Sequence, residues 1–258
     1  MKRRSFIKNS AIAAGAISAT SIPVFASAST IQVTDKNIIE WRVYHLSRTP
    51  NSRDRINQYF TEALIPFLKK RNVQFFQFNE YSKNEPVVLY VMVAYPTIST
   101  YFSCMKDLDN DTEYLEASKN YRNTPASQAT YGRYETFLLE AFDNFPVVKM
   151  PSGKGLFEMR LYESATEDAG RRKIAMFNKE EIAVFLKTGI NPVFFGKIIA
   201  GQYMPALLYM VAFNDMTERD ASWAKFSQDP DWIAMREKPE YADTVSNIQR
   251  VFLLPEGA

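Results

Sequence analysis

The sequence is organised around the six residues Phe157-Glu158-Met159-Arg160-Leu161-Tyr162, in which apolar side chains alternate with glutamate, arginine and tyrosine. The same order of residue types occurs earlier in the chain, in Ile39-Glu40-Trp41-Arg42-Val43-Tyr44. Strict alternation over six residues is typical of a β-strand with two unlike faces. Its recurrence predicts one structural design that the chain uses twice.

The segments that follow each of these strands also share an order. Apolar patterns and chain breakers predict the elements of each half. In the first half, strands are predicted at 38–44, 73–78, 87–95 and 134–142, and helices at 52–71 and 97–105. In the second half, strands are predicted at 156–162, 192–200, 205–213 and up to 254, and helices at 167–187 and around Trp223. Each half thus has the order β-α-β-β-α-β of a ferredoxin-like unit.

We therefore predict an α+β protein with two tandem ferredoxin-like units, at residues 29–145 and 155–258, joined by a linker at 146–154. The helices of such a unit cover one face of its sheet and leave the other face open. The second copy can supply the missing cover, so we expect the two sheets to pack face to face as an α/β-barrel-like body. The runs that begin at Pro86 and Pro205 align Tyr90 with Tyr209 in the two halves.

The first 28 residues have the features of an export signal. Arg3-Arg4-Ser5-Phe6-Ile7-Lys8 is similar to a twin-arginine signal, and Ala26-Ser27-Ala28 has the A-x-A pattern of a cleavage site. An ordinary secretory leader with two arginines is the alternative. The run is too short and too polar to anchor stably in a bilayer. We expect cleavage near Ala28 and a periplasmic or secreted product.

Charge and cysteine content exclude several kinds of protein. Removal of the four basic residues of the leader from the 31 in the chain leaves 27, against 29 acidic residues. A nearly neutral body gives no electrostatic reason to expect nucleic acid or an anionic membrane as partner. The single cysteine, Cys104, excludes an intrachain disulfide and a zinc site made of several cysteines. Cys104 lies in a predicted helix beside aromatic residues, which favours a buried apolar role.

The two alternating strands supply the candidate ligand-binding residues, which are Glu40, Arg42, Tyr44, Glu158, Arg160 and Tyr162. Charged groups on a covered sheet face must be paired. One interpretation is a polar cluster in a cavity, where the arginines bind an anionic or carbonyl-bearing ligand. The other is a structural ladder of glutamate and arginine that fixes the strand register.

His45 is the only histidine and the candidate catalytic residue, because it directly follows the first strand. It could act as a general base or an axial haem ligand, or have no special role. With no second histidine, we predict no metal site, and no cofactor is predicted either. The sequence also lacks a glycine-rich phosphate loop, a Gly-x-Ser-x-Gly elbow and a His-Glu-x-x-His motif.

The paired Glu-x-Arg-x-Tyr strands resemble those of the NIPSNAP family. The same resemblance extends to Ala63-Leu64-Ile65-Pro66, to Gly189-Ile190-Asn191-Pro192-Val193-Phe194-Phe195-Gly196 and to the run from Trp223 to Pro230, and it covers about 38–257. It implies the dimeric α/β-barrel superfamily, which also hosts cofactor-independent monooxygenases, haem-degrading enzymes and dye peroxidases. It provides no agreed catalytic residues, so fold alone does not assign a reaction.

Two hypotheses for function follow. The first is a binding or assembly module that holds a small hydrophobic or anionic ligand, or another copy of the chain in a homo-oligomer. The alternative is a cofactor-independent or haem-linked monooxygenase-type enzyme that acts on an aromatic or hydrophobic substrate. A position of His45 in a cavity with Arg42 or Tyr44 would favour the enzyme.

Overall fold

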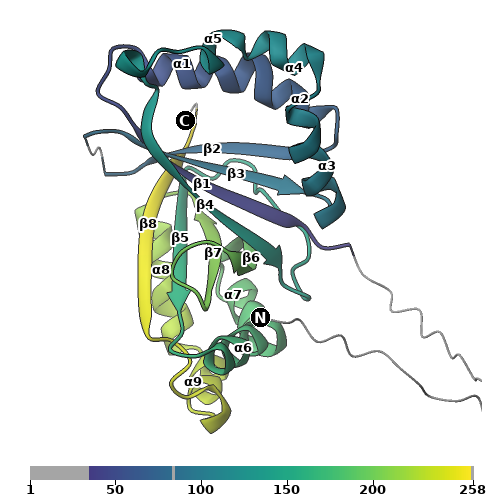
Figure 1. The fold of residues 1–258 in the computed structure, drawn as a ribbon. Coiled ribbons are helices and arrows are strands. Elements are labelled where there is room, and N and C mark those ends of the chain that lie inside the picture. The colour runs from purple at the N-terminus through teal and green to yellow at the C-terminus, as the bar shows by residue number, and fades with distance from the viewer. Residues whose placement is uncertain (1–34, 83–84, 257–258) are drawn as a thin grey trace, which may run out of the picture. The chain divides into compact units, whose positions relative to one another are not determined.

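The structure is a computed structural model that describes residues 35–82 and 85–256, so the predicted leader and its cleavage site lie outside the described residues. Within these ranges, antiparallel strands close into a barrel in the order β1-β3-β2-β8-β5-β7-β6-β4 (Figure 1). The strands are β1 Ile38–Leu46, β2 Gln74–Glu80, β3 Val88–Tyr95, β4 Tyr131–Ala141, β5 Leu156–Glu163, β6 Asn191–Ala200, β7 Ala206–Phe213 and β8 Asn247–Pro255.

The barrel consists of two groups of four strands with the same internal order. β1 lies between β3 and β4, and β5 lies between β7 and β8, so the two alternating strands occupy matching places. The groups meet where β2 pairs with β8 and where β4 pairs with β6. The second seam is tight, because a Cβ on Gly196 would lie 2.8 Å from the Cβ of Leu139.

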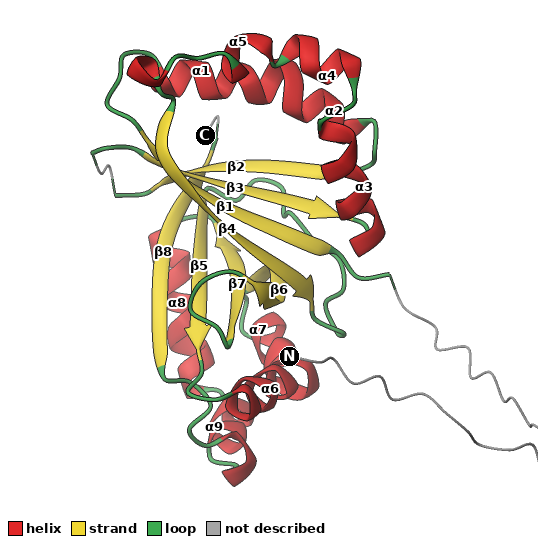
Figure 2. Cartoon of the chain, viewed as in Figure 1, coloured by secondary structure: helices red, strands yellow, loops and turns green. Residues whose placement is uncertain are grey.

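Helices cover the outside of both strand groups, α1–α5 over β1–β4 and α6–α9 over β5–β8 (Figure 2). Their bounds are α1 Ser52–Tyr59, α2 Ile65–Lys69, α3 Ile98–Leu108, α4 Thr112–Ala117, α5 Lys119–Arg122, α6 Glu167–Met176, α7 Ile182–Lys187, α8 Met216–Gln228 and α9 Pro230–Arg236. None of the helices in the described ranges combines the length and the apolar character needed to cross a membrane.

Both long helices predicted from the sequence contain a π-helical segment. Phe60–Leu64 separates α1 from α2, and Phe177–Glu181 separates α6 from α7. The first of these segments ends two residues before Pro66, whose missing N–H cannot complete a regular α-helical turn. The first π segment therefore stands next to Pro66, where a proline is expected to disturb a helix, and each segment shifts the phase of the side chains that follow it.

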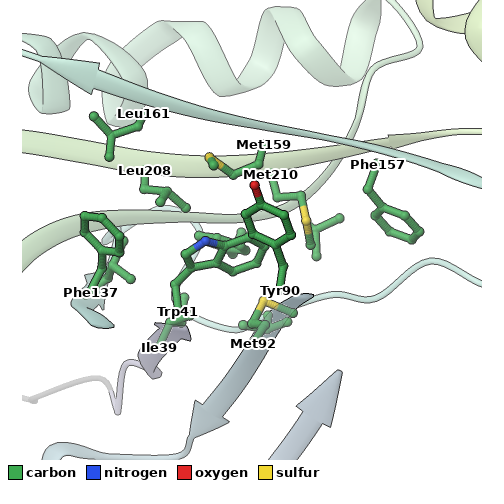
Figure 3. Close-up of a cluster of buried hydrophobic side chains, with 14 of the residues drawn as sticks. Ile39, Trp41, Tyr90, Met92, Phe137, Phe157, Met159, Leu161, Leu208 and Met210 are labelled. Atoms are coloured by element: carbon green, nitrogen blue, oxygen red, sulfur yellow. The ribbon is translucent and has the colours of Figure 1, made fainter. Parts of the chain in front are cut away.

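Apolar side chains fill the barrel interior (Figure 3). Trp41 lies at its centre, with ring centroids 5.9 Å from Tyr90, 6.1 Å from Phe78 and 6.2 Å from Phe194. Since the apolar residues of β1 and β5 point inward, the glutamates, arginines and tyrosines of these strands point outward, toward the helices. Of the two interpretations drawn from the sequence, a polar cluster in an internal cavity does not agree with this interior, which is packed with apolar groups. The charged groups of both strands lie on the outer face, under the helices.

The strand register corrects one residue equivalence drawn from the sequence. Arg42 lies opposite Val91, whereas Arg160 lies opposite Tyr209. Tyr209 therefore corresponds to Val91 and not to Tyr90. Tyr90 belongs to the barrel interior and Tyr209 to the core under the helices. The first half has one extra residue between its proline and the strand, and a shift of one residue turns a side chain to the other face.

Candidate ligand-binding site

In β1 the polar ladder is a closed set of hydrogen bonds. Arg42 donates from Nε to Glu40 Oε1 at 2.7 Å and from Nη2 to Oε2 at 2.8 Å, a bidentate pair. Its Nη1 donates to the Tyr44 hydroxyl at 3.2 Å, and the Tyr95 hydroxyl donates to Glu40 Oε2 at 3.0 Å. All three guanidinium nitrogens of Arg42 therefore donate to protein acceptors.

Aromatic rings enclose the β1 ladder. The Tyr44 ring stacks on Tyr134 at 5.2 Å and meets Tyr131 at 5.5 Å and Phe60 at 5.8 Å edge-on. Burial raises the pKa of the Tyr44 phenol, although the nearby Arg42 opposes the shift, so Tyr44 stays protonated. The ladder of the first half therefore has the features of a structural element.

In β5 the same residues are arranged differently, because α8 adds two side chains. Arg160 donates from Nε to Glu158 Oε1 at 2.7 Å and from Nη1 to the Tyr162 hydroxyl at 3.3 Å. Glu158 Oε2 is taken by Arg219 Nε at 2.9 Å and by Trp223 Nε1 at 2.8 Å. Arg219 Nη2 also donates to Oε1, at 3.2 Å. Within the described part of the chain, Nη2 of Arg160 donates to no protein acceptor.

Two guanidinium groups, those of Arg160 and Arg219, meet the single carboxylate of Glu158. Glu158 is fully buried, and Arg160 and Arg219 are only 13% and 14% exposed. Burial by itself would raise the pKa of Glu158, but the hydrogen bonds from Arg219 and Arg160 outweigh it and lower the pKa below its usual value. One ionised carboxylate thus serves two guanidinium groups. Asp220 adds a further pair to Arg219, but its side chain is mostly exposed.

A pocket of about 430 Å³ lies directly beside Arg160. The Trp223 ring lies against the guanidinium of Arg160, at 3.9 Å. The pocket is lined by three cationic side chains, one carboxylate and a mainly aromatic and aliphatic wall, namely Arg160, Lys173, Arg219, Glu181, Tyr162, Trp223, Phe226, Trp232, Val245 and Ile248, together with Ser227. We call this space the β5 pocket.

A buried ion pair forms one side of the β5 pocket. Lys173 Nζ lies 2.7 Å from Glu181 Oε2, and both side chains are almost inaccessible. Lys173 also lies 4.7 Å from the centroid of the Phe177 ring. Burial raises the pKa of the Glu181 carboxyl, and the positive charge of Lys173 only partly opposes this. The pair therefore adds no excess charge to the pocket.

A larger groove of about 520 Å³ lies over the seam between β4 and β6, next to α6. Among its charged groups, Lys36 pairs with Glu140 and Asp143, and Arg171 pairs with Asp168 outside the groove. The groove contains none of the predicted site residues. The β5 pocket is the better candidate, because it combines partly shielded cationic donors with aromatic walls.

His45 lies apart from both arginine ladders. Its Nε2 is 2.9 Å from Glu135 Oε1, and Arg133 Nε donates to the same oxygen at 3.2 Å. Since side chains alternate along a strand, His45 is on the barrel-facing side of β1, opposite to Arg42 and Tyr44. The structure therefore does not join His45 to the residues that sequence reasoning considered with it.

The remaining candidates for special chemistry are few. Cys104 is fully buried, and burial raises the pKa of its thiol, as expected of an apolar core position. In the part of the chain that the structure describes, no group of three or more His, Cys, Asp or Glu side chains could hold a metal ion.

Of the residues that line the β5 pocket, only Arg160 and Tyr162 were among the candidate ligand-binding residues predicted from the sequence, and the charged residues Lys173, Glu181 and Arg219 were not. Lys173 and Glu181 are eight residues apart, which in a regular α-helix separates them by about 80° around the axis. The π segment Phe177–Glu181 contains one residue more per turn and brings them onto one face. The periodicity of an unbroken helix could not reveal this pair.

Comparison with known proteins agrees with this architecture. Residues 157–257 match the model of the NIPSNAP family. An uncharacterised NIPSNAP domain protein from Burkholderia xenovorans has 20% identity and a TM-score of 0.35, and the match covers 40% of this chain and 95% of that one. A candidate monooxygenase from Lactobacillus acidophilus has 9% identity and a TM-score of 0.56 over 85% of this chain and 94% of its own.

An anthrone oxidase-like protein is similar in the same way, with 8% identity and a TM-score of 0.50 over 86% of this chain and 92% of its own. No protein with curated functional information matches the sequence. At these identities, the two oxygenase-like structures show a shared mixed α+β barrel fold and nothing about the reaction.

Proposed function

We propose that this chain, which carries a NIPSNAP domain at residues 157–257, is a small-ligand-binding protein whose ligand occupies the β5 pocket. One observation carries the proposal. The Glu-x-Arg-x-Tyr ladder of β1 is enclosed by aromatic rings. In β5 the same type of ladder borders an open pocket, and Nη2 of Arg160 donates to no acceptor among the described residues.

The composition of the β5 pocket supports this proposal. A volume of about 430 Å³ is within the range of sites for small organic molecules. Such sites are mainly apolar and contain a few placed polar groups. Here the rings of Trp223, Phe226 and Trp232 supply the apolar wall, and Arg160 and Tyr162 supply the polar groups.

We further propose that the chain consists of two ferredoxin-like units at 29–145 and 155–258, joined at 146–154. The matching strand orders of β1–β4 and β5–β8 support this arrangement. Assembly into a homo-oligomer remains a prediction.

The export route is also a proposal. The pattern Arg3-Arg4-Ser5-Phe6-Ile7-Lys8 supports a twin-arginine leader that delivers the protein outside the cytoplasm. Replacement of Arg3 and Arg4 by lysine should keep the precursor in the cytoplasm of its host. Export at the normal rate after this double substitution would contradict the twin-arginine route and favour an ordinary secretory leader.

The ligand-binding proposal can be tested with N-phenyl-1-naphthylamine, an uncharged fluorescent probe of apolar pockets. Its fluorescence should rise when it binds the mature protein. Ser227 lines the pocket and is exposed, so Ser227→Trp should fill the space and weaken binding at least about tenfold, while the matched Ser227→Ala should bind normally. Unchanged binding to Ser227→Trp would show that this pocket is not the ligand site.

The alternative, a monooxygenase-type enzyme, depends on the shared fold alone. His45 pairs with Glu135 at a barrel end and does not line the β5 pocket. Titration of the protein with hemin tests the haem-linked form of this hypothesis. A Soret shift that is lost in His45→Ala would support it, and an unchanged spectrum would remove it.

A further inference from the structure

We infer that the β5 pocket selects aromatic ligands that carry an acid group, and that Arg219 and Trp223 create this preference by drawing Glu158 away from Arg160. The inference rests on the proposed role of the pocket as a ligand site and names the class of ligand that it takes. Four observations support it: the hydrogen-bond pattern of Arg160, the local charge balance, the aromatic wall, and the different arrangement in β1.

The comparison between the two ladders identifies the free donor. In β1, Glu40 engages both Nε and Nη2 of Arg42. In β5, Glu158 engages only Nε of Arg160, because its second oxygen accepts from Arg219 and Trp223. The corresponding positions of α3, four and eight residues after its N-cap Thr97, are Tyr101 and Met105, which lack a comparable cationic donor. The difference between the halves therefore comes from α8.

The charge balance favours an anion at this donor. Arg160 and Arg219 share the buried carboxylate of Glu158, and the other partner of Arg219, Asp220, is mostly exposed, so that water screens its charge. Lys173 is neutralised by Glu181 within the same pocket. A carboxylate or sulfonate that reaches Nη2 of Arg160 would accept a charge-assisted hydrogen bond from a guanidinium that is only 13% exposed, and such bonds are strong where the donor is shielded from water. A neutral acceptor such as a carbonyl could also accept from Arg160, but it would not balance the positive charge.

The pocket wall favours an aromatic body for the same ligand. Trp223 covers Arg160, and the Phe226 and Trp232 rings lie 4.5 Å apart by centroid. The Phe226 ring is buried, while the Trp232 ring is partly accessible to solvent. Flat rings bind well against such surfaces in offset or edge-to-face geometry. The acid group at Arg160 and the rings at Trp232 can therefore be satisfied by one small molecule.

Two closely related fluorescent probes test the inference. 8-Anilino-1-naphthalenesulfonate is an aromatic anion, and N-phenyl-1-naphthylamine has the same ring system without the sulfonate. We expect the wild-type protein to bind the anion roughly 10- to 100-fold more tightly, as expected for one charge-assisted hydrogen bond. Arg160→Met should remove this preference, so that the two probes bind with similar affinity.

A second variant tests the role of α8 while Arg160 stays in place. Arg219→Tyr/Trp223→Phe introduces the α3-like tyrosine, keeps a ring in the wall and frees Glu158 to form a bidentate pair with Arg160. This variant should show the same loss of preference for the anionic probe over the uncharged probe as Arg160→Met does. An unchanged circular dichroism spectrum and a cooperative unfolding transition show that both variants are folded.

The outcomes separate the inference from the proposed function. Equal affinity of the wild-type protein for both probes, or an anion preference that survives in Arg160→Met, would overturn the inference and leave the pocket as a ligand site. An anion preference that survives in the α8 double variant would overturn the role of Arg219 and Trp223. If Ser227→Trp fails to block either probe, the proposed function itself is wrong.

Discussion

Arg42 and Arg160 occupy matching strand positions, but their loss should destabilise the fold to different extents. Arg42→Met leaves the buried Glu40 with the Tyr95 hydroxyl as its remaining side-chain partner, whereas Arg160→Met leaves Glu158 with Arg219 and Trp223. Loss of one partner from a buried ion pair lowers the free energy of unfolding by about 3–5 kcal/mol. Loss of one hydrogen bond among several lowers it by about 1–2 kcal/mol. Urea denaturation of both variants measures the difference.

The control for this prediction is Glu40→Leu/Arg42→Met, which removes both charges of the β1 pair. It should recover much of the stability that Arg42→Met loses, because no buried charge remains without a partner. Equal losses for Arg42→Met and Arg160→Met would contradict the different roles assigned to the two ladders.

The Lys173–Glu181 pair provides a second prediction for individual residues. Lys173→Met should lower the free energy of unfolding by about 3–5 kcal/mol, since it leaves a carboxylate in an almost inaccessible position. Lys173→Met/Glu181→Met should be close to the wild type, because methionine fills a similar volume without charge. Chemical denaturation of the three proteins checks both values. A double variant as unstable as the single one would mean that the pair is required for packing and not only for neutrality.

Sequence reasoning at this scale identified groups on one strand correctly but could not identify their partners. Alternation places Glu158, Arg160 and Tyr162 on one face, as the structure has them. Arg219 and Trp223 reach Glu158 from more than 60 residues away, through the packing of α8 on the sheet. Local patterns contain no information about such a contact. For the same reason, the alignment of Tyr90 with Tyr209 missed a shift of one residue.

At the scale of elements, the strands and helices follow from the sequence because their periods are regular. The predicted ranges agree with the observed strands within a few residues, except for β8, where only the end was predicted. The π segments Phe60–Leu64 and Phe177–Glu181 could not be predicted, because an added residue in a turn leaves the composition of a helix unchanged. Their effect appears only in which side chains share a face.

The seam between β4 and β6 gives a prediction for this scale. Gly196→Ala would place a Cβ 2.8 Å from the Cβ and 2.9 Å from the Cδ2 of Leu139. One strand of the seam must then move, so the free energy of unfolding should fall by about 1–3 kcal/mol. Gly132→Ala in β4 is the matched control, because its Cβ would meet no atom within 4 Å. Thermal or chemical unfolding of both variants measures this difference in stability. A neutral Gly196→Ala would indicate a looser seam.

At the scale of the whole molecule, the sequence predicted a mixed α+β body with packed sheets but did not show which face of the two alternating strands lies inside. Both faces of β1 and β5 are covered, one by the barrel interior and one by helices. The alternation shows that the faces differ but not which one is inside. The interior takes the apolar face because its opposing surface is also an apolar sheet face. On the outer face the charged groups pair with one another, and in β5 Glu158 also accepts from Arg219 and Trp223 of α8.

The closed barrel makes each half depend on the other, which leads to the last prediction. Segments 29–154 and 155–258, produced separately, would each expose an inner sheet face to water, in the second segment the face with Phe157, Met159 and Leu161. Exposed apolar surface of this kind favours association. Neither segment should remain a folded monomer, and refolding them together should give a one-to-one complex with a single unfolding transition. Size-exclusion chromatography with light scattering measures this. A stable, cooperatively folded monomer of 155–258 would contradict it, because the apolar inner face of that half would then need no cover from β1–β4.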